Sequence, residues 1–278
     1  MTPADYEYLA NFLLGTSGLA LGTGKEYLIE ARLVPLAQSC DLEGIEQLVT
    51  ELRKGNNSRL SSAVTEAMTT NETSFFRDKK PFEELREQLL PSLTKARQTR
   101  RTLRIWCAAA STGQESYSIA MTLLEAFPEA RNWKVEILGT DLDKAALARC
   151  EEGVYSQFEV QRGLPVQLLM KYFEQCETGW RVKDELRAWT RWEQCNLLDD
   201  FSRFGTFDIV FCRNVLIYFQ NETKKQILDR LARRVHPDGY LYLGAAETVL
   251  GISEEFQRFR ECRSAVYTPA SAAPVAAS

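Results

Sequence analysis

The stretch "LRIWCAAASTGQES", residues 103–116, decides the fold that this sequence predicts. An apolar run, a short turn and the start of an amphipathic segment follow one another, which predicts a strand, a tight turn and a helix. In an open parallel sheet, the turn after such a strand contributes to a ligand site. This turn has one glycine, Gly113, and it lacks both the glycine cluster and the lysine of phosphate-binding loops. The sequence therefore predicts a ligand without a di- or triphosphate.

The pattern continues along the chain as short apolar runs that alternate with amphipathic segments. Apolar runs at 135–141, 207–212 and 240–245 are separated by helical patterns, which predicts an α/β fold with a doubly wound, mostly parallel, Rossmann-like sheet. Residues 154–194 break this rhythm, because "YFEQCETGW", "RVKDELRAWT" and "RWEQC" resemble short strands joined by polar turns. We expect a small inserted antiparallel β-subdomain there, on the edge of the sheet.

Four parts of the chain are predicted. Residues 1–78 carry helical spacing almost throughout and predict a helical N-terminal domain. Residues 79–101 are expected to be a connecting helix or linker, and residues 102–268 to be the sheet domain. Residues 269–278 are small or hydroxylated and offer little to pack, so a disordered tail is expected.

Composition excludes several classes of protein. The net charge of -4 and the pI near 5.4 argue against a protein that mainly binds nucleic acid. Asp5 and Glu7 stand where a signal peptide would be basic, and the uncharged stretch 8–24 contains four glycines and is too short to span a membrane. We expect a soluble cytoplasmic protein without membrane insertion. The cysteines form no CxxC pair and predict reduced thiols and no metal site; they are residues 40, 107, 150, 176, 195, 212 and 262.

Two carboxylates narrow the chemical class of the expected ligand. Asp141 ends the second predicted strand, where such folds place an acceptor for ribose hydroxyls, and Glu115 begins the helix after the turn. A ribose ligand without phosphates points to adenosine-type cofactors, S-adenosylmethionine first. The residues leave simpler roles open: Glu115 would also favour a helix dipole, and Asp141 would also cap the next helix. His236 is the only histidine and fits a turn, which argues against histidine-driven hydrolysis.

Three stretches resemble the motifs of one family. "TTNETSFFRD" (69–78), "AAASTGQESYSIA" (108–120) and "FDIVFCRNVLIYF" (207–219) are similar to motifs of the CheR-type chemoreceptor glutamate methyltransferases. "NLL" (196–198) and "PDGYLYLGAAET" (237–248) fall where that family has its own versions, and the likeness runs from about residue 5 to 268.

The resemblance implies S-adenosylmethionine as cofactor and methyl transfer to glutamate side chains of chemoreceptor cytoplasmic helices. Arg77 and Tyr218 would line the place where the methyl group meets its acceptor. The chain would act as a monomer. Carried over residue by residue, the cofactor contacts would be Asn71, Thr73, Arg77, Glu115, Asp141, Asn196, Leu197, Arg213 and Asn214.

Simpler roles stay open for several of these residues. In these simpler roles, Arg77 pairs with surface acids, Tyr218 packs in the core, and Asn196 and Asn214 cap turns. The family commonly has a histidine and a serine where this chain has Ala245 and Ala246. Residues 1–80 hold 8 Lys or Arg and 11 Asp or Glu, so a receptor would dock on local basic patches. Those patches are Arg53, Lys54 and Arg59, or Lys79 and Lys80.

Other functions remain as rivals. A methyltransferase of this fold acting on a small molecule would transfer methyl groups without a receptor. A signalling or scaffold relative would bind S-adenosylmethionine and form no product. A nicotinamide-dependent dehydrogenase is disfavoured because the turn at 108–116 lacks a pyrophosphate-binding glycine cluster.

Overall fold

The structure, a computed structural model, describes residues 1–270. Its contacts divide the chain into two units, one of Met1–Thr70 with Tyr218–Thr223 and one of Asn71–Ile217 with the chain from Lys224 onward. We call them the helical unit and the sheet unit. The expected boundary at residue 78 is too late, because residues 71–78 pack with the sheet unit: Phe75, for example, is fully buried in its core.

The helical unit buries one apolar core between short helices. Thr2 and Asp5 form a capping box at the start of the first helix, and Gly18 ends it with a left-handed backbone. Leu9, Leu13 and Leu33 are fully buried in the core. The helices are α1 (Pro3–Ser17), α2 (Glu26–Ser39), α3 (Ile45–Arg53) and α4 (Ser58–Ala67).

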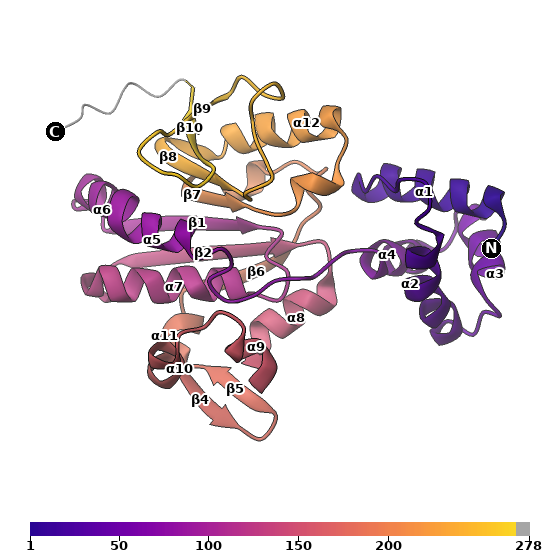
Figure 1. The fold of residues 1–278 in the computed structure, drawn as a ribbon, viewed down its shortest axis with the longest axis horizontal. Coiled ribbons are helices and arrows are strands. Elements are labelled where there is room, and N and C mark those ends of the chain that lie inside the picture. Colours follow the sequence, from indigo (N-terminus) through magenta and orange to yellow (C-terminus); the bar gives the residue numbers. More distant parts are fainter. Residues whose placement is uncertain (271–278) are drawn as a thin grey trace. The chain divides into compact units, whose positions relative to one another are not determined.

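The sheet unit contains a twisted sheet in the order β6-β2-β1-β7-β8-β10-β9. The first five strands in this order are parallel, and β10 pairs antiparallel with both β8 and β9. The strand order reverses at β1, so the prediction of a doubly wound, mostly parallel sheet is confirmed (Figure 1). The strands are β1 (Thr102–Ala108), β2 (Lys134–Asp141), β6 (Thr190–Gln194), β7 (Phe207–Cys212), β8 (Val235–Leu243), β9 (Phe256–Arg258) and β10 (Val266–Pro269).

Alternation along β1 sends side chains to both faces of the sheet. Ile105 and Cys107 join the core cluster that includes α7, whereas Trp106 packs against Phe201 and Phe207 on the opposite face. The helices are α5 (Lys80–Glu84), α6 (Leu90–Arg97), α7 (Gln114–Ala126), α8 (Lys144–Glu152) and α12 (Asn221–Ala232), with a π-helical turn η1 (Leu85–Leu89) and 3-10 turns η2 (Pro128–Asn132), η3 (Ser202–Phe204) and η4 (Leu216–Tyr218).

Of the two expectations for residues 79–101, a connecting helix or a linker, the helix agrees with α5, η1 and α6, and these turns pack on the sheet. Leu85 and Leu89 are fully buried in the same core as β1, and the Glu84 carboxylate accepts a hydrogen bond from the Arg263 backbone N–H. The segment reads as a connector because it lies between two sequence patterns. Its apolar side chains instead pack against the sheet.

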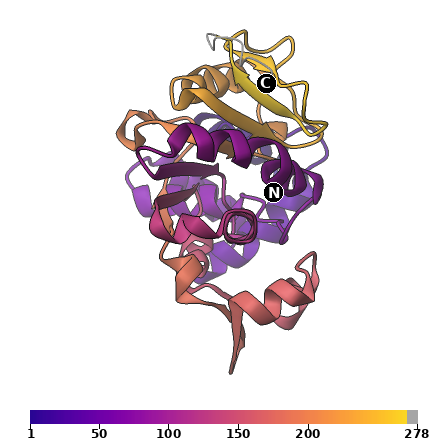
Figure 2. The same ribbon diagram turned by 90° about the vertical axis from the view of Figure 1, so that its left-hand side faces the viewer.

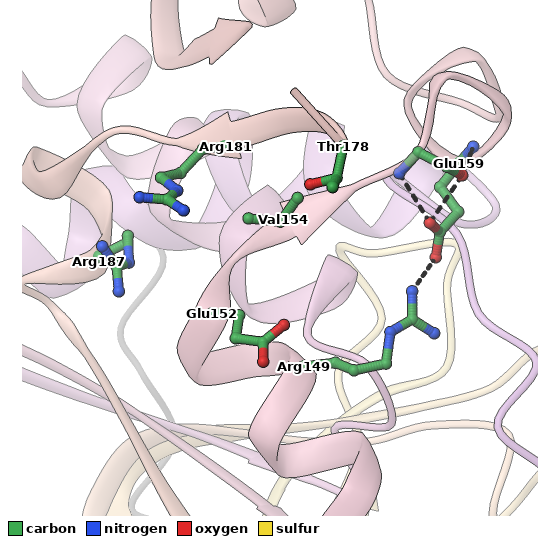
Figure 3. Close-up of a pocket in the computed structure, with 8 residues that line it drawn as sticks. Arg149, Glu152, Val154, Glu159, Thr178, Arg181 and Arg187 are labelled. Atoms are coloured by element: carbon green, nitrogen blue, oxygen red, sulfur yellow. Dashed lines mark hydrogen bonds and ion pairs between the residues drawn. The ribbon is translucent and has the colours of Figure 1, made fainter. Parts of the chain in front are cut away.

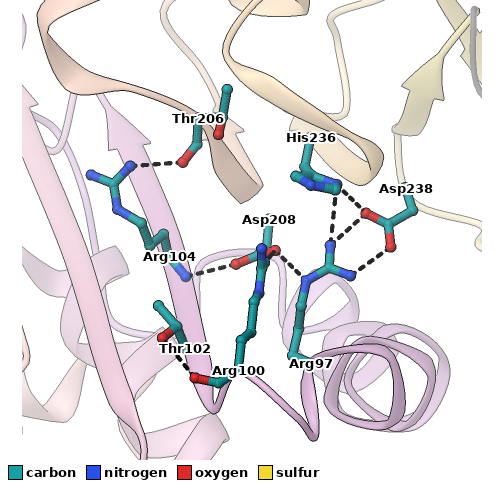
Figure 4. A network of polar contacts seen from close by, with 8 residues as sticks. All are labelled: Arg97, Arg100, Thr102, Arg104, Thr206, Asp208, His236 and Asp238. Atoms are coloured by element: carbon teal, nitrogen blue, oxygen red, sulfur yellow. Dashed lines mark hydrogen bonds and ion pairs between the residues drawn. The ribbon is translucent and has the colours of Figure 1, made fainter.

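A charge network with a buried centre, Arg97 and Asp208, closes the amino ends of the strands (Figure 4). Asp208 is 1% exposed and accepts hydrogen bonds from Arg97 Nε at 2.7 Å and Arg100 Nη2 at 2.5 Å. Arg97 also binds Asp238, and Asp238 contacts His236 Nδ1. His236 lies in the first residues of β8. The expectation that it lies in a turn is wrong. This network ties α6 to β7 and β8.

The inserted β-subdomain is smaller than the expected 154–194. Its strands pair antiparallel in the order β3-β5-β4, and helices lie between them, so most of "RVKDELRAWT" is not strand. In Figures 1 and 2, this insertion lies beyond α7. Its elements are β3 (Val154–Tyr155), α9 (Gln157–Gln161), α10 (Val166–Tyr172), β4 (Phe173–Cys176), β5 (Gly179–Val182) and α11 (Asp184–Arg187).

Residues 190–194, the "TRWEQ" part of the expected insertion, form β6 of the main sheet. They pair in parallel with β2, with Trp192 opposite Gly139. A Cβ on Gly139 would lie 2.2 Å from the Trp192 ring, so glycine leaves the space that the ring fills. The sequence places this strand in the insertion because its polar residues are typical of a solvated hairpin.

The expected tail starts too early. Pro269 belongs to β10, and Ala270 donates its backbone N–H to the Glu255 carbonyl. The rest of the expected tail, residues 271–278, lies outside the described residues. Within residues 1–270, no helix is long and apolar enough to cross a membrane.

Candidate active site

The residues that the sequence predicts for cofactor binding all belong to the sheet unit. Asp141 ends β2 and Arg213 follows β7, while Asn196 and Leu197 follow β6. Neighbouring parallel strands therefore bring most of these residues to the carboxyl edge of the sheet, beside the reversal at β1.

The turn after β1 has an alternating left-handed backbone. Ala109, Ser111 and Gly113 have φ angles of 64°, 52° and 93°. A non-glycine residue in this region costs about 1–3 kcal/mol and persists only where its surroundings enforce it. A Cβ on Gly113 would lie 3.0 Å from both Cys150 Sγ and Tyr155 Oη, so the single glycine of the turn is where a side chain has no room.

Three side chains hold this turn. Tyr155 Oη donates to the Thr112 carbonyl at 2.7 Å, and Cys150 Sγ donates to the Ser111 carbonyl at 3.2 Å. The Asp141 carboxylate accepts the Ser111 backbone N–H at 2.8 Å. The turn is thus fixed without any phosphate ligand. Burial raises the pKa of the Cys150 thiol.

Asp141 does not cap α8. Its carboxylate accepts backbone N–H groups from Ser111 and Asp143, and the N-cap of α8 is Asp143, whose Oδ1 accepts the Ala145 N–H at 2.8 Å. Asp141 is 7% exposed, and this burial raises its pKa. The capping role is therefore taken by the next acid along the chain, Asp143, and Asp141 stays at the strand end.

The segment 71–78 wraps onto the same edge. Asn71 donates from Nδ2 to Asp143 at 2.5 Å, and its carbonyl accepts Ser111 Oγ at 3.0 Å. Phe75 packs edge-on against Tyr155 and Phe173. Asn71 and Asp141 are thus linked through Asp143 and Ser111. Thr73 lies within this segment and is half-buried.

Arg77 is half-buried, and Nη1 donates to the Glu72 carbonyl at 2.9 Å. Among residues 1–270, its guanidinium forms no salt bridge within 4.0 Å, and the Glu72 carboxylate pairs with Arg162. The simpler role of pairing with a surface acid is therefore not seen. Tyr218 belongs to the helical unit, where its carbonyl accepts the Ala20 N–H at 3.0 Å. The meeting of Arg77 and Tyr218 at the acceptor stays a prediction.

Glu115 and Arg213, two expected cofactor contacts, bind each other. Arg213 Nη1 donates to Glu115 at 2.7 Å, and Nη2 donates to Asp78 Oδ2 at 2.6 Å and to the Arg77 carbonyl at 3.2 Å. Burial raises the pKa of Glu115, and Arg213 opposes this shift. Arg213 therefore anchors the Arg77 loop to the start of α7.

Asn196 and Leu197 follow β6 directly. The Cys195 backbone N–H donates to the Asp141 carbonyl at 2.9 Å, which brings this turn beside Asp141. Asn196 Oδ1 accepts the Leu198 N–H at 3.0 Å, so the turn-capping role left open for it is present. Leu197 is 7% exposed. An apolar wall beside a carboxylate suits the adenine and ribose of a nucleoside.

The sequence missed Asp78, Asp143 and Glu247 as parts of this site. Asp78 and Asp143 each stand next to a residue that the motifs single out, but their partners come from distant segments. Glu247 lies in the stretch 237–248, and its carboxylate accepts a backbone N–H after β7. Within the described residues, no group of three His, Cys, Asp or Glu side chains forms a metal site.

A separate groove lies between α8 and the inserted sheet (Figure 3). It has a volume of about 590 Å³ and contains none of the predicted cofactor residues. Arg149 and Glu159 pair across 2.7 Å at its rim, so its charges are of both signs. Its lining residues are Arg149, Glu152, Val154, Ser156, Glu159, Thr178, Arg181 and Arg187.

The chemistry of the site fits an adenosine cofactor with a cationic tail. It offers a buried carboxylate, Asp141, and a partly buried one, Glu115, for hydroxyl and ammonium groups, and the turn between them is held by its own protein contacts. A pyrophosphate would meet two acids at this edge. The two carboxylates at this edge therefore fit S-adenosylmethionine and do not fit the pyrophosphate of a dinucleotide.

Comparison with known proteins gives the family. A family model described as "CheR methyltransferase, SAM binding domain" matches residues 71–265. The chain belongs to the CheR methyltransferase family. A "Chemotaxis protein methyltransferase" of Vibrio parahaemolyticus is 39% identical over 265 residues, which are 94% of this chain and 95% of the relative. "Chemotaxis protein methyltransferase 1" of Pseudomonas aeruginosa is 40% identical over 259 residues, 91% of this chain and 93% of the relative.

The CheR family model starts at Asn71, where the sheet unit also starts. A more distant "Chemotaxis protein methyltransferase" of Borreliella burgdorferi is 32% identical over 256 residues, covering 90% of each chain. These similarities run through both units. The chain is thus a CheR methyltransferase with a site of the S-adenosylmethionine type.

Proposed function

We propose that this protein transfers the methyl group of S-adenosylmethionine to glutamate side chains on the cytoplasmic part of a chemoreceptor, giving glutamyl methyl esters. The observation that carries the proposal is the carboxyl edge of the sheet, where the Asp141 and Glu115 carboxylates flank a turn with a single glycine. The names of the relatives support the chemotaxis setting.

The cofactor would be held by its ribose and its methionine part. Asp141 accepts hydroxyl hydrogens, because each carboxylate oxygen retains a lone pair beyond the backbone N–H that it already binds. Leu197 and Asn196 would hold the adenine. Glu115 would attract the cationic amino group, and Asn71, Thr73 and Arg77 would bind the cofactor from the segment before α5.

S-adenosylmethionine, when bound, supplies a sulfonium methyl group that a carboxylate oxygen accepts, so that an O–C bond forms as the S–C bond breaks. A glutamate with an ordinary pKa of about 4.3 is already ionised at neutral pH, so the chain need not provide a general base. This agrees with a site built without histidine.

The contribution of the protein is then alignment and exclusion of water. Holding reacting atoms about 3–3.5 Å apart can supply roughly 7–11 kcal/mol of the barrier. Arg77 would orient the incoming carboxylate, and the Arg213 side chain fixes the loop that carries it. A tight ion pair with Arg77 would stabilise the reactants and slow transfer, so few contacts to the acceptor are expected. Tyr218 would donate a hydrogen bond nearby.

The experiment is incubation of the protein with methyl-labelled S-adenosylmethionine and a receptor cytoplasmic fragment, followed by mild base. We expect label on the receptor that base releases as methanol, the behaviour of a carboxyl ester. Arg77→Ala should sharply reduce transfer, and Arg86→Ala, at an exposed arginine nearby, is the matched control. Base-stable label would contradict the glutamate acceptor. Cofactor binding without any product would favour the scaffold alternative.

A further inference from the structure

Glu247 follows β8 and receives four backbone N–H groups. Its Oε2 accepts from Gly244 at 2.6 Å and from Asn214 at 2.8 Å, and its Oε1 accepts from Val215 at 2.9 Å and from Ile217 at 3.3 Å. The residue is 7% exposed. Buried backbone N–H groups need acceptors, and here one carboxylate serves three N–H groups of the turn that leaves β7 and one at the end of β8.

Gly244 makes this arrangement possible. A Cβ at this position would lie 2.6 Å from Glu247 Oε2 and 2.9 Å from the Asn214 backbone nitrogen. Its backbone is not left-handed, so the requirement for glycine is one of space. The glycine and the carboxylate therefore act together to bring the end of β8 against the turn after β7.

The turn that Glu247 holds carries expected cofactor contacts. Asn214 has a φ angle of 58°, a conformation that persists only where neighbours enforce it. Arg213, next to it, reaches Glu115 and Asp78 with a side chain that is 1% exposed. An error of about an ångström in this turn would displace both residues, and such misplacements can cost about a hundredfold in rate.

We propose that Glu247 is a positioning residue for this site: its ionised carboxylate holds residues 213–217 in the conformation that binds the cofactor. This inference rests on the proposed function for what is bound, but the geometry that carries it belongs to the chain alone. Among side chains, only a carboxylate has two oxygen acceptors and no hydrogen-bond donor. A glutamine at the same place would turn an NH2 group toward two N–H donors.

The test uses the full chain with Glu247→Gln and Glu247→Asp. The matched control is Glu84→Gln, because Glu84 is also buried and also accepts backbone N–H groups, from Arg263 and Ser264, which are not expected site residues. Calorimetry measures the Kd for S-adenosylhomocysteine. Hydrogen exchange with mass spectrometry measures the amides of peptides covering 213–217 and 244–247.

Glu247→Gln is expected to raise the Kd about tenfold or more, because charged hydrogen bonds to a buried group are lost. Exchange should accelerate in those two peptides and stay unchanged elsewhere. Glu84→Gln should change the Kd by less than about twofold, as for distant sites. Glu247→Asp, which keeps the charge, should bind more tightly than the glutamine variant.

Unchanged Kd and exchange in Glu247→Gln would overturn the proposal, as would an equal loss of affinity in Glu84→Gln. If Glu247→Gln does not fold, Glu247→Asp decides by the same two measurements. If the wild type binds no S-adenosylhomocysteine, the proposed function fails, and the exchange measurement still decides whether Glu247 holds the turn.

Discussion

Arg213 donates a 2.7 Å hydrogen bond to Glu115, and the two side chains are 1% and 13% exposed. This contact joins the end of β7 to the first turn of α7 across 98 residues of chain. Two residues expected to touch the cofactor are therefore also partners of each other. The two charges are withdrawn from water together. In the protein without cofactor, each charge is therefore stabilised by the other.

Removing one member of this pair should cost more than removing both. Arg213→Met leaves the Glu115 carboxylate buried without its partner, which typically costs about 3–5 kcal/mol of the free energy of unfolding. Adding Glu115→Gln should restore part of this loss. A double-mutant cycle by urea unfolding is expected to give a coupling above about 1 kcal/mol. Additive effects of the two substitutions would contradict the pairing.

The network at the amino ends of the strands should produce a measurable acid dependence. The hydrogen bond from Arg97 is the main cause that lowers the pKa of Asp238 from 3.8 to about 2. A lowered carboxyl pKa adds stability above pH 3.8, and this stability is lost as the pH falls toward 2. Because the Asp238 side chain is 43% exposed, screening reduces the contribution to about 1 kcal/mol.

Asp238→Asn should therefore lower the free energy of unfolding by about 1 kcal/mol at neutral pH. The difference from the wild type should shrink as the pH falls through the range 3.8 to about 2. Chemical unfolding across this pH range is the measurement. A difference that stays constant down to the lowest pH would mean that the ion pair is not its source.

Gly139 should tolerate no side chain. Gly139→Ala places a Cβ 2.2 Å from the Trp192 ring, and overpacking of this kind costs about 1–3 kcal/mol. Trp192→Leu in the same chain should return part of the loss, as read from thermal or urea unfolding. Gly22→Ala, where a Cβ meets nothing within 4 Å, is the control. Equal stability of both alanine variants would argue against the β2–β6 packing.

Much of the sheet and the position of its ligand edge could be predicted because they depend on local patterns. The turn with Gly113 and the strand end at Asp141 are visible within a few residues of sequence. β6 could not be assigned, because Arg191 and Glu193 give it the polarity of a hairpin, and only its pairing with β2 reveals its place. The role of residues 79–101 likewise depends on contacts with β1 and the 263–264 turn.

The side-chain partners within the site were the least predictable part. The sequence leaves a capping role open for Asp141, and the structure gives that role to Asp143. Glu247 stands 33 residues from the Asn214 N–H that it accepts. No local pattern encodes such a contact, since it arises only when β7 and β8 lie side by side.

Asp141 should contribute strongly to cofactor affinity. Asp141→Asn replaces an acceptor-only carboxylate, and the Kd for S-adenosylhomocysteine measured by calorimetry should rise about tenfold or more. Asp184→Asn, at a side chain that is 95% exposed, is the matched control and should leave the Kd unchanged. An unaltered Kd in Asp141→Asn would remove this residue from the site.

The central claim, methyl transfer to receptor glutamates, is tested most directly by mapping the product. A receptor cytoplasmic fragment is incubated with the protein and S-adenosylmethionine, and its peptides are sequenced by mass spectrometry. The account predicts methyl groups on glutamate side chains, only when both the protein and the cofactor are present. Methyl groups on lysine or other side chains, or none in a protein that binds the cofactor, would contradict it.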